Sequence, residues 1–167
     1  GACFVEFDMQ FSADGIPVVI HDEFLDRTAG RNLSVLDTRF SDLKQISVGE
    51  TDRFGGRFNH SLLPSLEEIV EIFTDWPHAQ AVVEIKRHSL KRFGHDAIVK
   101  TLGKLLQPIR EQSIVISFDY DVGFEFKRNG EYKMGWILEA YNDQVREQVE
   151  ALKPDYLVIK DERIPPS

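Results

Sequence analysis

The sequence predicts an α/β fold built on a largely parallel sheet. From residue 80 to residue 160, short apolar runs typical of buried strands alternate with segments whose apolar residues fall at helical spacing. Such alternation favours right-handed strand-helix-strand crossovers, which place successive strands parallel to one another. A glycine-rich phosphate loop after an early strand, typical of doubly wound sheets, does not occur in the sequence.

We therefore expect part of a (β/α)8 (TIM) barrel. A complete barrel takes roughly 250 residues, and this chain has 167, so the barrel interpretation requires strands that lie outside it. The chain starts at Gly1 and enters a strand-like segment almost at once, which favours a piece of a longer protein. We expect residues 1–167 to form a single, partial barrel domain.

The first predicted strand covers residues 2–11, where apolar and polar side chains alternate. Glu6, Asp8 and Gln10 fall on the same face, opposite the apolar one. An Asp-Gly turn then leads into a β-branched run at residues 16–20, so the two segments predict a hairpin.

Residues 22–63 are polar and contain several glycines, so we expect a long inserted loop with one short helix near residues 41–47. A longer helix should follow directly. Ser65 can cap its amino end, and Glu68 stands three residues later, where it completes a capping box.

Four more strands are expected after this helix, with helices between them. The strands are predicted at residues 80–86, 113–118, 132–138 and 155–160.

Glu6 and Asp8 suggest chemistry at the first strand. Residues two apart on a strand point the same way and lie roughly 6.6 Å apart, so both carboxylates could converge on one small cation. Burying them without a partner would cost several kcal/mol. Glu84 and Lys86 repeat the pattern on the strand predicted at residues 80–86. Oxygen ligands of this kind suit Mg²⁺ or Ca²⁺.

A histidine follows the second strand. His21 could exchange a proton near neutral pH, and the adjacent Asp22 could steer its ring or cap the next turn. Three acids, a lysine and a histidine near strand ends together predict a metal-assisted phosphoryl site.

Each of these features also has a purely structural interpretation. A strand at the sheet edge would leave Glu6 and Asp8 merely solvated. Glu84 and Lys86 could form a strand-end ion pair, and the pair at residues 21–22 could serve structure alone. The other histidines, at positions 60, 78, 88 and 95, are expected on the surface.

Composition excludes several classes of protein. The net charge of −8 and the scattered basic residues argue against a nucleic-acid partner. No apolar run approaches the roughly 20 residues that span a bilayer, so we expect no transmembrane segment. The single cysteine excludes an internal disulfide and is compatible with a reducing compartment. We expect a cytoplasmic protein, with a periplasmic or secreted one as the alternative.

The order of these motifs resembles the glycerophosphodiester phosphodiesterase family. The resemblance rests on VEFDMQFSADGIPVVIHDEFLDRT at residues 5–28, with its Glu-x-Asp, Asp-Gly-x-Pro-Val, His-Asp and Asp-Arg-Thr motifs in order. LPSLEEIVEIF, VVEIK, ISFD at residues 116–119 and GWIL at residues 135–138 extend it over most of the chain.

The resemblance implies a (β/α)8 barrel that hydrolyses small-molecule glycerophosphodiesters to sn-glycerol 3-phosphate and an alcohol. It implies Glu6, Asp8 and Glu84 as ligands of one divalent cation, Mg²⁺ or Ca²⁺. Lys86 matches a phosphate-contacting lysine, and His21 matches one of two acid/base histidines. The inserted loop at residues 22–63 matches the family's insertion over the barrel mouth, which helps to shape the glycerol pocket.

The chain departs from the family pattern at both ends, because the resemblance implies a first strand that ends in His-Arg-Gly and last strands, one of them ending in a Thr-Asp pair, which this partial barrel lacks. The family's other histidine stands in a His-Arg-Gly sequence, and no His-Arg-Gly occurs in these 167 residues. Three alternatives therefore stay open: a related phospholipase C or sphingomyelinase D type of phosphodiesterase, a catalytically degenerate metal- or ligand-binding barrel, and a purely structural domain.

Overall fold

The structure is a computed structural model that describes residues 2–129 and 132–160. Its strands form one six-stranded sheet in the order β2-β1-β3-β4-β5-β6. The strands are β1 (Phe4–Phe11), β2 (Pro17–Val19), β3 (Gln80–Ile85), β4 (Ser113–Ser117), β5 (Lys133–Ile137) and β6 (Tyr156–Val158). Each lies within a segment predicted as a strand.

Strand pairing confirms the predicted hairpin and the parallel sheet. β1 and β2 are antiparallel, with Met9 opposite Val19. All other neighbouring pairs, from β1–β3 to β5–β6, are parallel. The part of the chain that the structure describes thus supplies six strands with β2 and β6 outermost, an open sheet that agrees with part of a barrel.

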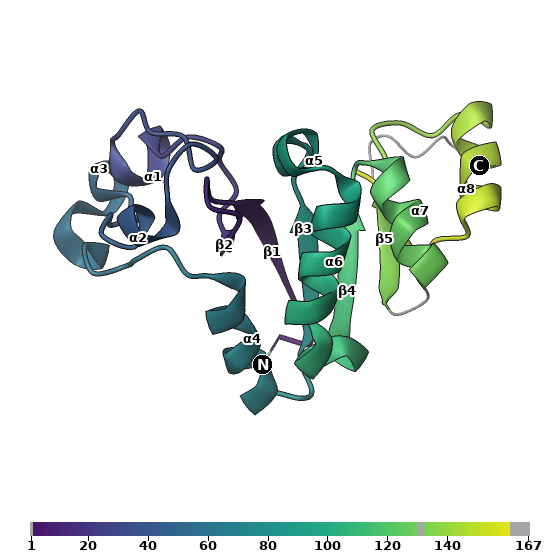
Figure 1. Cartoon of the computed structure of the whole chain (residues 1–167), viewed down its shortest axis with the longest axis horizontal. Coiled ribbons are helices and arrows are strands. Elements are labelled where there is room, and N and C mark those ends of the chain that lie inside the picture. Colours follow the sequence, from purple (N-terminus) through teal and green to yellow (C-terminus); the bar gives the residue numbers. More distant parts are fainter. Residues whose placement is uncertain (1, 130–131, 161–167) are drawn as a thin grey trace.

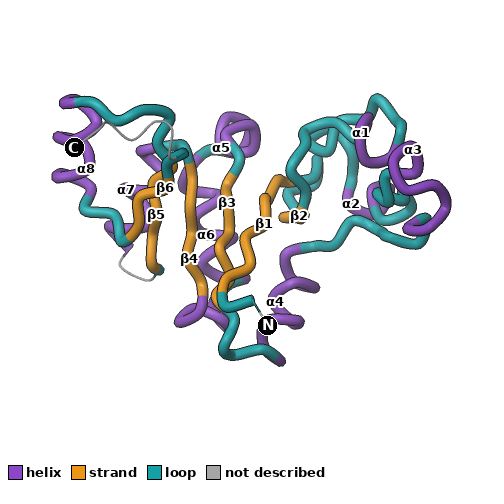
Figure 2. Tube along the Cα trace, turned by 180° about the vertical axis from the view of Figure 1, so that it is seen from behind, coloured by secondary structure: helices purple, strands orange, loops and turns teal. Residues whose placement is uncertain are grey.

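The structure describes helices α1 (Asp26–Ala29), α2 (Phe40–Leu43), α3 (Thr51–Phe54), η1 (Gly55–Phe58), α4 (Leu66–Asp75), α5 (Arg87–Phe93), α6 (His95–Leu105), η2 (Gln107–Gln112), α7 (Tyr120–Asn129) and α8 (Asp143–Leu152). Helices α1, α2 and α3 lie in the insertion, beyond the end of the sheet that carries β2 (Figure 1). Where Figure 2 looks onto the strands, α6 and α7 lie behind them and cover one face of the sheet. No helix among the described residues is both long and apolar enough to cross a bilayer.

The main hydrophobic core lies between the sheet and these helices. Ala81, Val83 and Ile85 of β3 are 0–1% exposed, and they belong to the same buried cluster as Leu66 of α4 and Leu102 of α6. Alternate residues of a strand point to opposite faces. The helix-covered face therefore takes the apolar half of each strand, and the opposite face is left for other side chains.

The capping box predicted for α4 is present. The Ser65 hydroxyl accepts a hydrogen bond from the Glu68 N–H, and the Glu68 carboxylate accepts one from the Ser65 N–H. Both groups satisfy donors that the first helical turn leaves unpaired. The same Glu68 carboxylate lies 2.6 Å and 2.8 Å from the Lys44 ammonium, which ties α4 to the segment after α2.

For residues 22–63, the short helix expected near residues 41–47 corresponds to α2, but the expectation of an otherwise polar loop was wrong. The insertion also contains α1, α3 and η1, and together with Val18 and Ile20 it forms a second hydrophobic core. That core comprises Val18, Ile20, Leu25, Val35, Leu43, Ile46 and Leu63. Helical turns of four residues are too short to show a 3.6-residue period, so irregularly spaced apolar residues concealed the core.

Candidate active site

The carboxyl ends of β1 and β3 bring the predicted acids together. Asp8 and Glu84 are paired in the parallel register. Glu6 stands opposite Val82 in that register, so it points to the same face two residues earlier. This is the face opposite the helices, and Val82 there packs against a small apolar cluster that includes Ile116 of β4.

One oxygen from each carboxylate of Glu6, Asp8 and Glu84 lies within 4.8 Å of the other two. Exposure differs along the group, since Glu84 is buried, Asp8 is half-buried and Glu6 is exposed. The solvated-edge interpretation of the first strand fails, because β1 lies between β2 and β3, although Glu6 itself is exposed. The ion pair considered for Glu84 and Lys86 is present.

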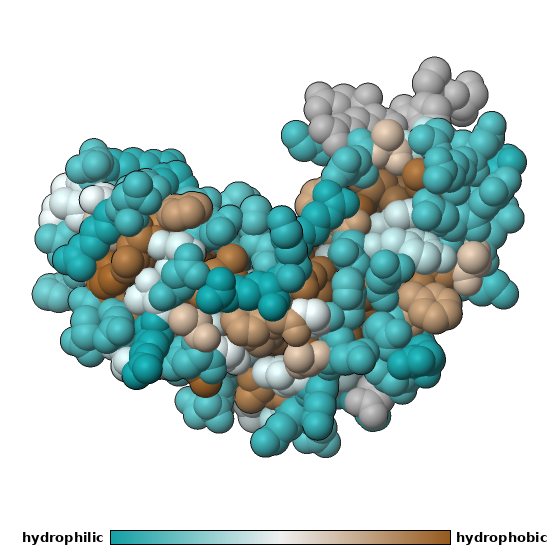
Figure 3. Space-filling view, turned by 45° about the horizontal axis from the view of Figure 1, so that its top comes forward, coloured by the Kyte–Doolittle hydropathy of each residue, from teal (hydrophilic) through white to brown (hydrophobic). Residues whose placement is uncertain are grey.

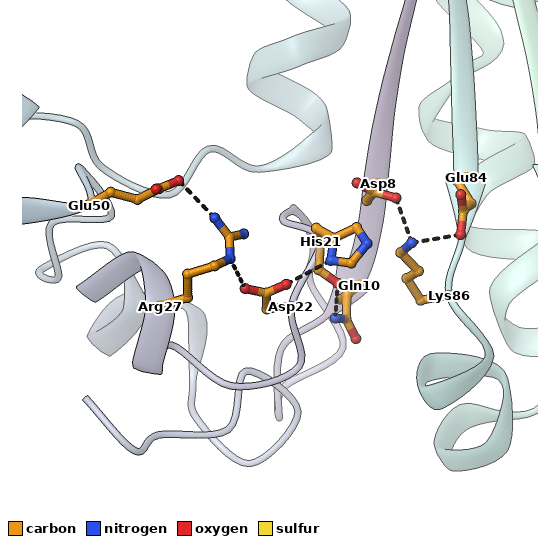
Figure 4. A network of polar contacts seen from close by, with 8 residues as sticks. All are labelled: Asp8, Gln10, His21, Asp22, Arg27, Glu50, Glu84 and Lys86. Carbon is orange, nitrogen blue, oxygen red and sulfur yellow. Dashed lines mark hydrogen bonds and ion pairs between the residues drawn. The ribbon is translucent and has the colours of Figure 1, made fainter. Parts of the chain in front are cut away.

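Lys86 lies between two of these acids (Figure 4). Its ammonium nitrogen is 2.6 Å from Asp8 Oδ1 and 2.7 Å from Glu84 Oε1. Burial opposes the charge of Lys86, but the hydrogen bonds and charges of the two acids outweigh burial and raise the pKa of the ammonium. Lys86 is thus held in its charged form at the point where β3 ends and α5 begins.

In Glu6 the surroundings disfavour the charged form. Although Glu6 is exposed at the surface, partial loss of hydration among the surrounding protein atoms, and then the negative charges of Asp8 and Glu84, raise the pKa of its carboxyl above the ordinary value. Lys86 and His21 lower that pKa, but by less. The cluster therefore holds more negative charge than its lysine compensates.

This donor set fits a divalent cation. Three carboxylates and one ammonium sum to a charge of −2, and each carboxylate that contacts Lys86 keeps a second oxygen for another partner. Carboxylate oxygens are the ligands that Mg²⁺ and Ca²⁺ prefer. The group of Glu6, Asp8 and Glu84 could hold such an ion.

A second group with metal-ligand spacing consists of His95, Asp119 and Asp121. Here Asp119 Oδ1 lies 2.9 Å from His95 Nε2 and accepts a hydrogen bond from the Val122 N–H. Asp119 therefore caps α7, and these contacts give the group a structural role.

His21 lies beside the acids because β2 pairs with β1. The Ile20 N–H donates to the Asp8 carbonyl, and the Gln10 side-chain amide donates to the His21 carbonyl at 3.0 Å. Gln10, which a solvated strand edge would expose, is fully buried. The backbone of His21 is thus fixed to β1, while its side chain is 64% exposed and accessible.

The ring of His21 contacts Asp22, and Asp22 contacts Arg27. His21 Nδ1 and Asp22 Oδ1 lie 2.7 Å apart, and Arg27 Nε donates to Asp22 Oδ2 at 2.6 Å. Burial opposes the charge of Asp22, but the hydrogen bonds from Arg27 and His21 outweigh it and lower the pKa of Asp22. Asp22 is therefore an ionised acceptor.

A pocket of about 450 Å³ lies between the insertion and the end of β3. In Figure 3 the molecule is hollowed between the insertion, at the left, and the C-terminal elements, at the right. Eight residues line the pocket: His21, Asp22, Glu23, Phe24, Asp26, Arg27, Lys86 and His88. His21 and Lys86, which the sequence placed on separate segments, share its wall.

Sequence reasoning did not assign a role to several residues at this pocket. His88 is exposed, as expected, but it also lines the pocket, with Nδ1 2.9 Å from Glu23 Oε2. The sequence analysis also gave no role to Arg27, which lines the pocket, or to its partner Glu50. The available signal was the Asp-Arg-Thr motif, whose arginine stands five residues after Asp22.

The sequence model of the glycerophosphoryl diester phosphodiesterase family matches residues 1–157. The chain belongs to this family. The resemblance inferred from the motifs is therefore confirmed.

Relatives within the family include mammalian proteins. The chain is 28% identical over 136 residues to glycerophosphodiester phosphodiesterase 1 of Mus musculus, and 30% identical over 137 residues to that of Bos taurus. Each match covers 77% of this chain and 38% of the relative. The chain thus matches about two fifths of the length of these curated relatives.

Solved structures of the family share the fold. A phosphodiesterase of Oleispira antarctica, in complex with the product sn-glycerol-3-phosphate, superposes with a TM-score of 0.81 at 25% identity. That match covers 99% of this chain and 66% of the Oleispira chain. A glycerophosphodiester phosphodiesterase of Thermotoga maritima gives a TM-score of 0.66 at 28% identity, over 93% and 59% of the two chains.

Proposed function

We propose that this chain carries the metal-binding half and one acid/base histidine of an enzyme that hydrolyses glycerophosphodiesters to sn-glycerol 3-phosphate and an alcohol. The observation that carries the proposal is the convergence of Glu6, Asp8 and Glu84 beside Lys86, at a pocket that His21 also lines. Membership of the glycerophosphoryl diester phosphodiesterase family supports the choice of substrate.

Each residue has a role in this proposal. Glu6, Asp8 and Glu84 hold one divalent cation, Mg²⁺ or Ca²⁺. When bound, the cation would polarise the phosphodiester oxygens and lower the pKa of a glycerol hydroxyl. Lys86 lies between the acids and the pocket, where its positive charge stabilises the negative charge that develops on phosphorus.

Proton transfer to the departing alcohol falls to His21. Its ring is 64% exposed at the pocket, and imidazole exchanges protons near neutral pH. The attacking hydroxyl must also lose its proton to a base. The family resemblance implies a histidine of a His-Arg-Gly motif, which residues 1–167 do not contain. Within this chain, His88 is the second histidine on the pocket wall.

Product analysis tests this function. Purified protein is incubated with glycerophosphoethanolamine and Mg²⁺ or Ca²⁺, or with a chelator, and the products are identified by phosphorus NMR. We expect ion-dependent release of sn-glycerol 3-phosphate. Accumulation of a cyclic phosphate would instead support the phospholipase C or sphingomyelinase D type.

Replacement of His21 sharpens the test. His21→Ala should lower kcat by about 10²-fold or more, the usual contribution of one acid/base group, with metal affinity little changed. Release without either ion, or an unchanged rate in the variant, would contradict the proposed roles. Binding of metal and of sn-glycerol 3-phosphate without turnover would identify the second candidate, a degenerate binding barrel.

A further inference from the structure

Four side chains form a continuous chain of contacts from His21 into the insertion (Figure 4). His21 Nδ1 lies 2.7 Å from Asp22 Oδ1, and Asp22 Oδ2 accepts from Arg27 Nε at 2.6 Å. A second nitrogen of Arg27, one of its terminal pair, donates to Glu50 Oε1 at 2.8 Å. The insertion residue Glu50 is thus linked to the acid/base histidine through two intermediates.

Asp22 is held at both of its oxygens. One oxygen faces the imidazole and the other faces the guanidinium, so rotation of the carboxylate would break one contact or the other. An ionised carboxylate only accepts hydrogen bonds, so the His21 nitrogen beside it must carry the hydrogen. This contact therefore selects the imidazole tautomer with a proton on Nδ1 and leaves Nε2 free for proton exchange.

The orientation of that free nitrogen suits the site. In Figure 4 the second ring nitrogen of His21 lies on the side of the ring that faces Asp8 and Lys86. The His21 backbone is fixed independently, because its carbonyl accepts from the buried Gln10 amide. With the backbone fixed by Gln10, the ring orientation depends on Asp22.

Arg27 is suited to hold Asp22 because the guanidinium is a rigid, planar fork. Its nitrogens reach two carboxylates at once, which a point charge on a flexible stem does less well. Arg27 is 53% exposed, and exposed ion pairs contribute little to stability. The contacts of Arg27 are therefore better explained by positioning than by stabilisation of the fold.

Glu50 has an unusual backbone conformation that aims it at Arg27. Its φ is 47°, in the left-handed region that residues other than glycine adopt uncommonly. The Glu50 N–H donates to the carbonyl of Thr28, which adjoins Arg27 in α1. The backbone and the side chain of Glu50 both contact the helix that carries Arg27. Glu50 therefore holds Arg27 in place within the insertion.

We infer that Arg27, braced by Glu50 of the insertion, is a positioning residue that fixes the tautomer and orientation of the His21 imidazole through Asp22. This inference rests on the proposed function for the role of His21. It adds that the insertion does more than form a wall of the pocket, because it also sets the tautomer and orientation of the His21 ring.

Nitrogen NMR of the histidine rings tests the positioning of His21 by Arg27 independently of catalytic activity. The protein is labelled with ¹⁵N at its five histidines, and the His21 signals are assigned by their loss in His21→Gln. Spectra are recorded about two pH units above the ordinary histidine pKa of about 6.5, where a free ring is neutral. We expect the Nδ1–H tautomer in the wild type and a tautomer mixture in Arg27→Met.

Arg53→Met is the matched control. Arg53 contacts the same Glu50, at 3.4 Å, and belongs to the same insertion, but its guanidinium lies over the Phe54 ring and is not part of the contacts that join His21, Asp22 and Arg27. The control should therefore keep the wild-type tautomer. Identical spectra for Arg27→Met and the wild type would overturn the inference, as would equal changes in both variants.

Leaving-group dependence supplies the second measurement. A p-nitrophenolate leaves without help from an acid, whereas an ethanolamine alkoxide needs a proton. Arg27→Met should lower kcat about tenfold for glycerophosphoethanolamine, a fraction of what a general acid contributes, and less than about twofold for the p-nitrophenyl diester. Equal losses on both substrates would indicate general disruption and contradict the inference. Absence of turnover on either substrate by the wild type would contradict the proposed function, while the NMR result would still decide the brace.

Discussion

Asp8 and Glu84 lie opposite each other on the parallel strands β1 and β3, and the Lys86 ammonium bridges them at 2.6 Å and 2.7 Å. Two carboxylates at this separation repel each other, and burial strengthens the repulsion. The lysine compensates one of the two charges, and Glu6 nearby adds a third negative charge. The cluster therefore has an excess of negative charge, which would favour the binding of a divalent cation.

Removing the lysine should destabilise the metal-free protein. Lys86→Met leaves Asp8 and Glu84 without a counter-charge, so we expect a loss of about 3 kcal/mol in the free energy of unfolding, as for one partner of a buried pair. Urea denaturation in the presence of a chelator measures the loss. Saturating Mg²⁺ or Ca²⁺ should restore part of it, because the cation supplies the missing positive charge.

Lys127→Met is the control for this prediction. Lys127 pairs with Asp155 at 2.8 Å on a more exposed part of the surface, where an ion pair is worth about 1 kcal/mol or less. A loss in Lys86→Met no larger than that of Lys127→Met would show that the acids need no counter-charge.

Replacing a buried acid should weaken metal binding. Glu84→Gln keeps the size of the side chain and removes its charge, so we expect affinity for Mg²⁺ or Ca²⁺ to fall by at least about tenfold, as loss of a supporting group near a metal already does. Titration calorimetry measures the change. Glu67→Gln, in the first turn of α4, removes an exposed charge and should leave affinity unaltered. Equal affinities in the two variants would exclude Glu84 as a ligand.

The raised pKa of Glu6 predicts a pH-dependent stability. A raised pKa means that the folded protein binds this proton more tightly than the unfolded chain, so ionised Glu6 destabilises the metal-free fold above its ordinary pKa of 4.5. As the pH falls through the raised pKa, that destabilisation disappears. In chelator, Glu6→Gln should therefore be more stable than the wild type at pH 7.

The difference between Glu6→Gln and the wild type should shrink to nothing below pH 4.5, the ordinary value for this group. Thermal unfolding across this range provides the measurement. A difference that did not vary with pH would show that the ionisation of Glu6 is not its cause.

The core of the insertion makes a separate prediction. Leu43 is fully buried among Val18, Leu25 and the other members of that cluster. Leu43→Ala should therefore cost about 3 kcal/mol, as the cavity left by a buried leucine usually does. Hydrogen exchange should accelerate across residues 22–63. Leu62→Ala, at a position that is 48% exposed, should leave exchange unchanged. Equal protection in both variants would contradict an independent core.

Local sequence patterns predicted the elements well where one short-range interaction decides the structure. The Ser65–Glu68 capping box spans three residues and appears as expected. The alternation in β1 placed Glu6, Asp8 and Gln10 on one face, and the register with β3 agrees with that placement. Strand and helix periods are properties of the local backbone, so they can be recognised without knowledge of the fold.

The insertion was predicted less well because its order comes from contacts between distant residues. Leu25, Val35 and Leu63 belong to three different segments and meet only in the folded insertion. Their spacing follows neither a strand nor a helix period, so the segment looked like a polar loop. For the same reason Arg27 and Glu50 showed no sign in the sequence that they would form a contact.

Residue types and their spacing were enough to nominate the residues that could carry chemistry and the strand faces on which they lie, because side-chain direction follows from backbone period. Membership of the glycerophosphoryl diester phosphodiesterase family is also readable from the motifs. Which of these groups contact one another follows only from the folded structure. The pairing of Asp8 with Glu84 through Lys86, and the support of His21 by Arg27 through Asp22, depend on strand register and on how the insertion packs, which are properties of the whole fold.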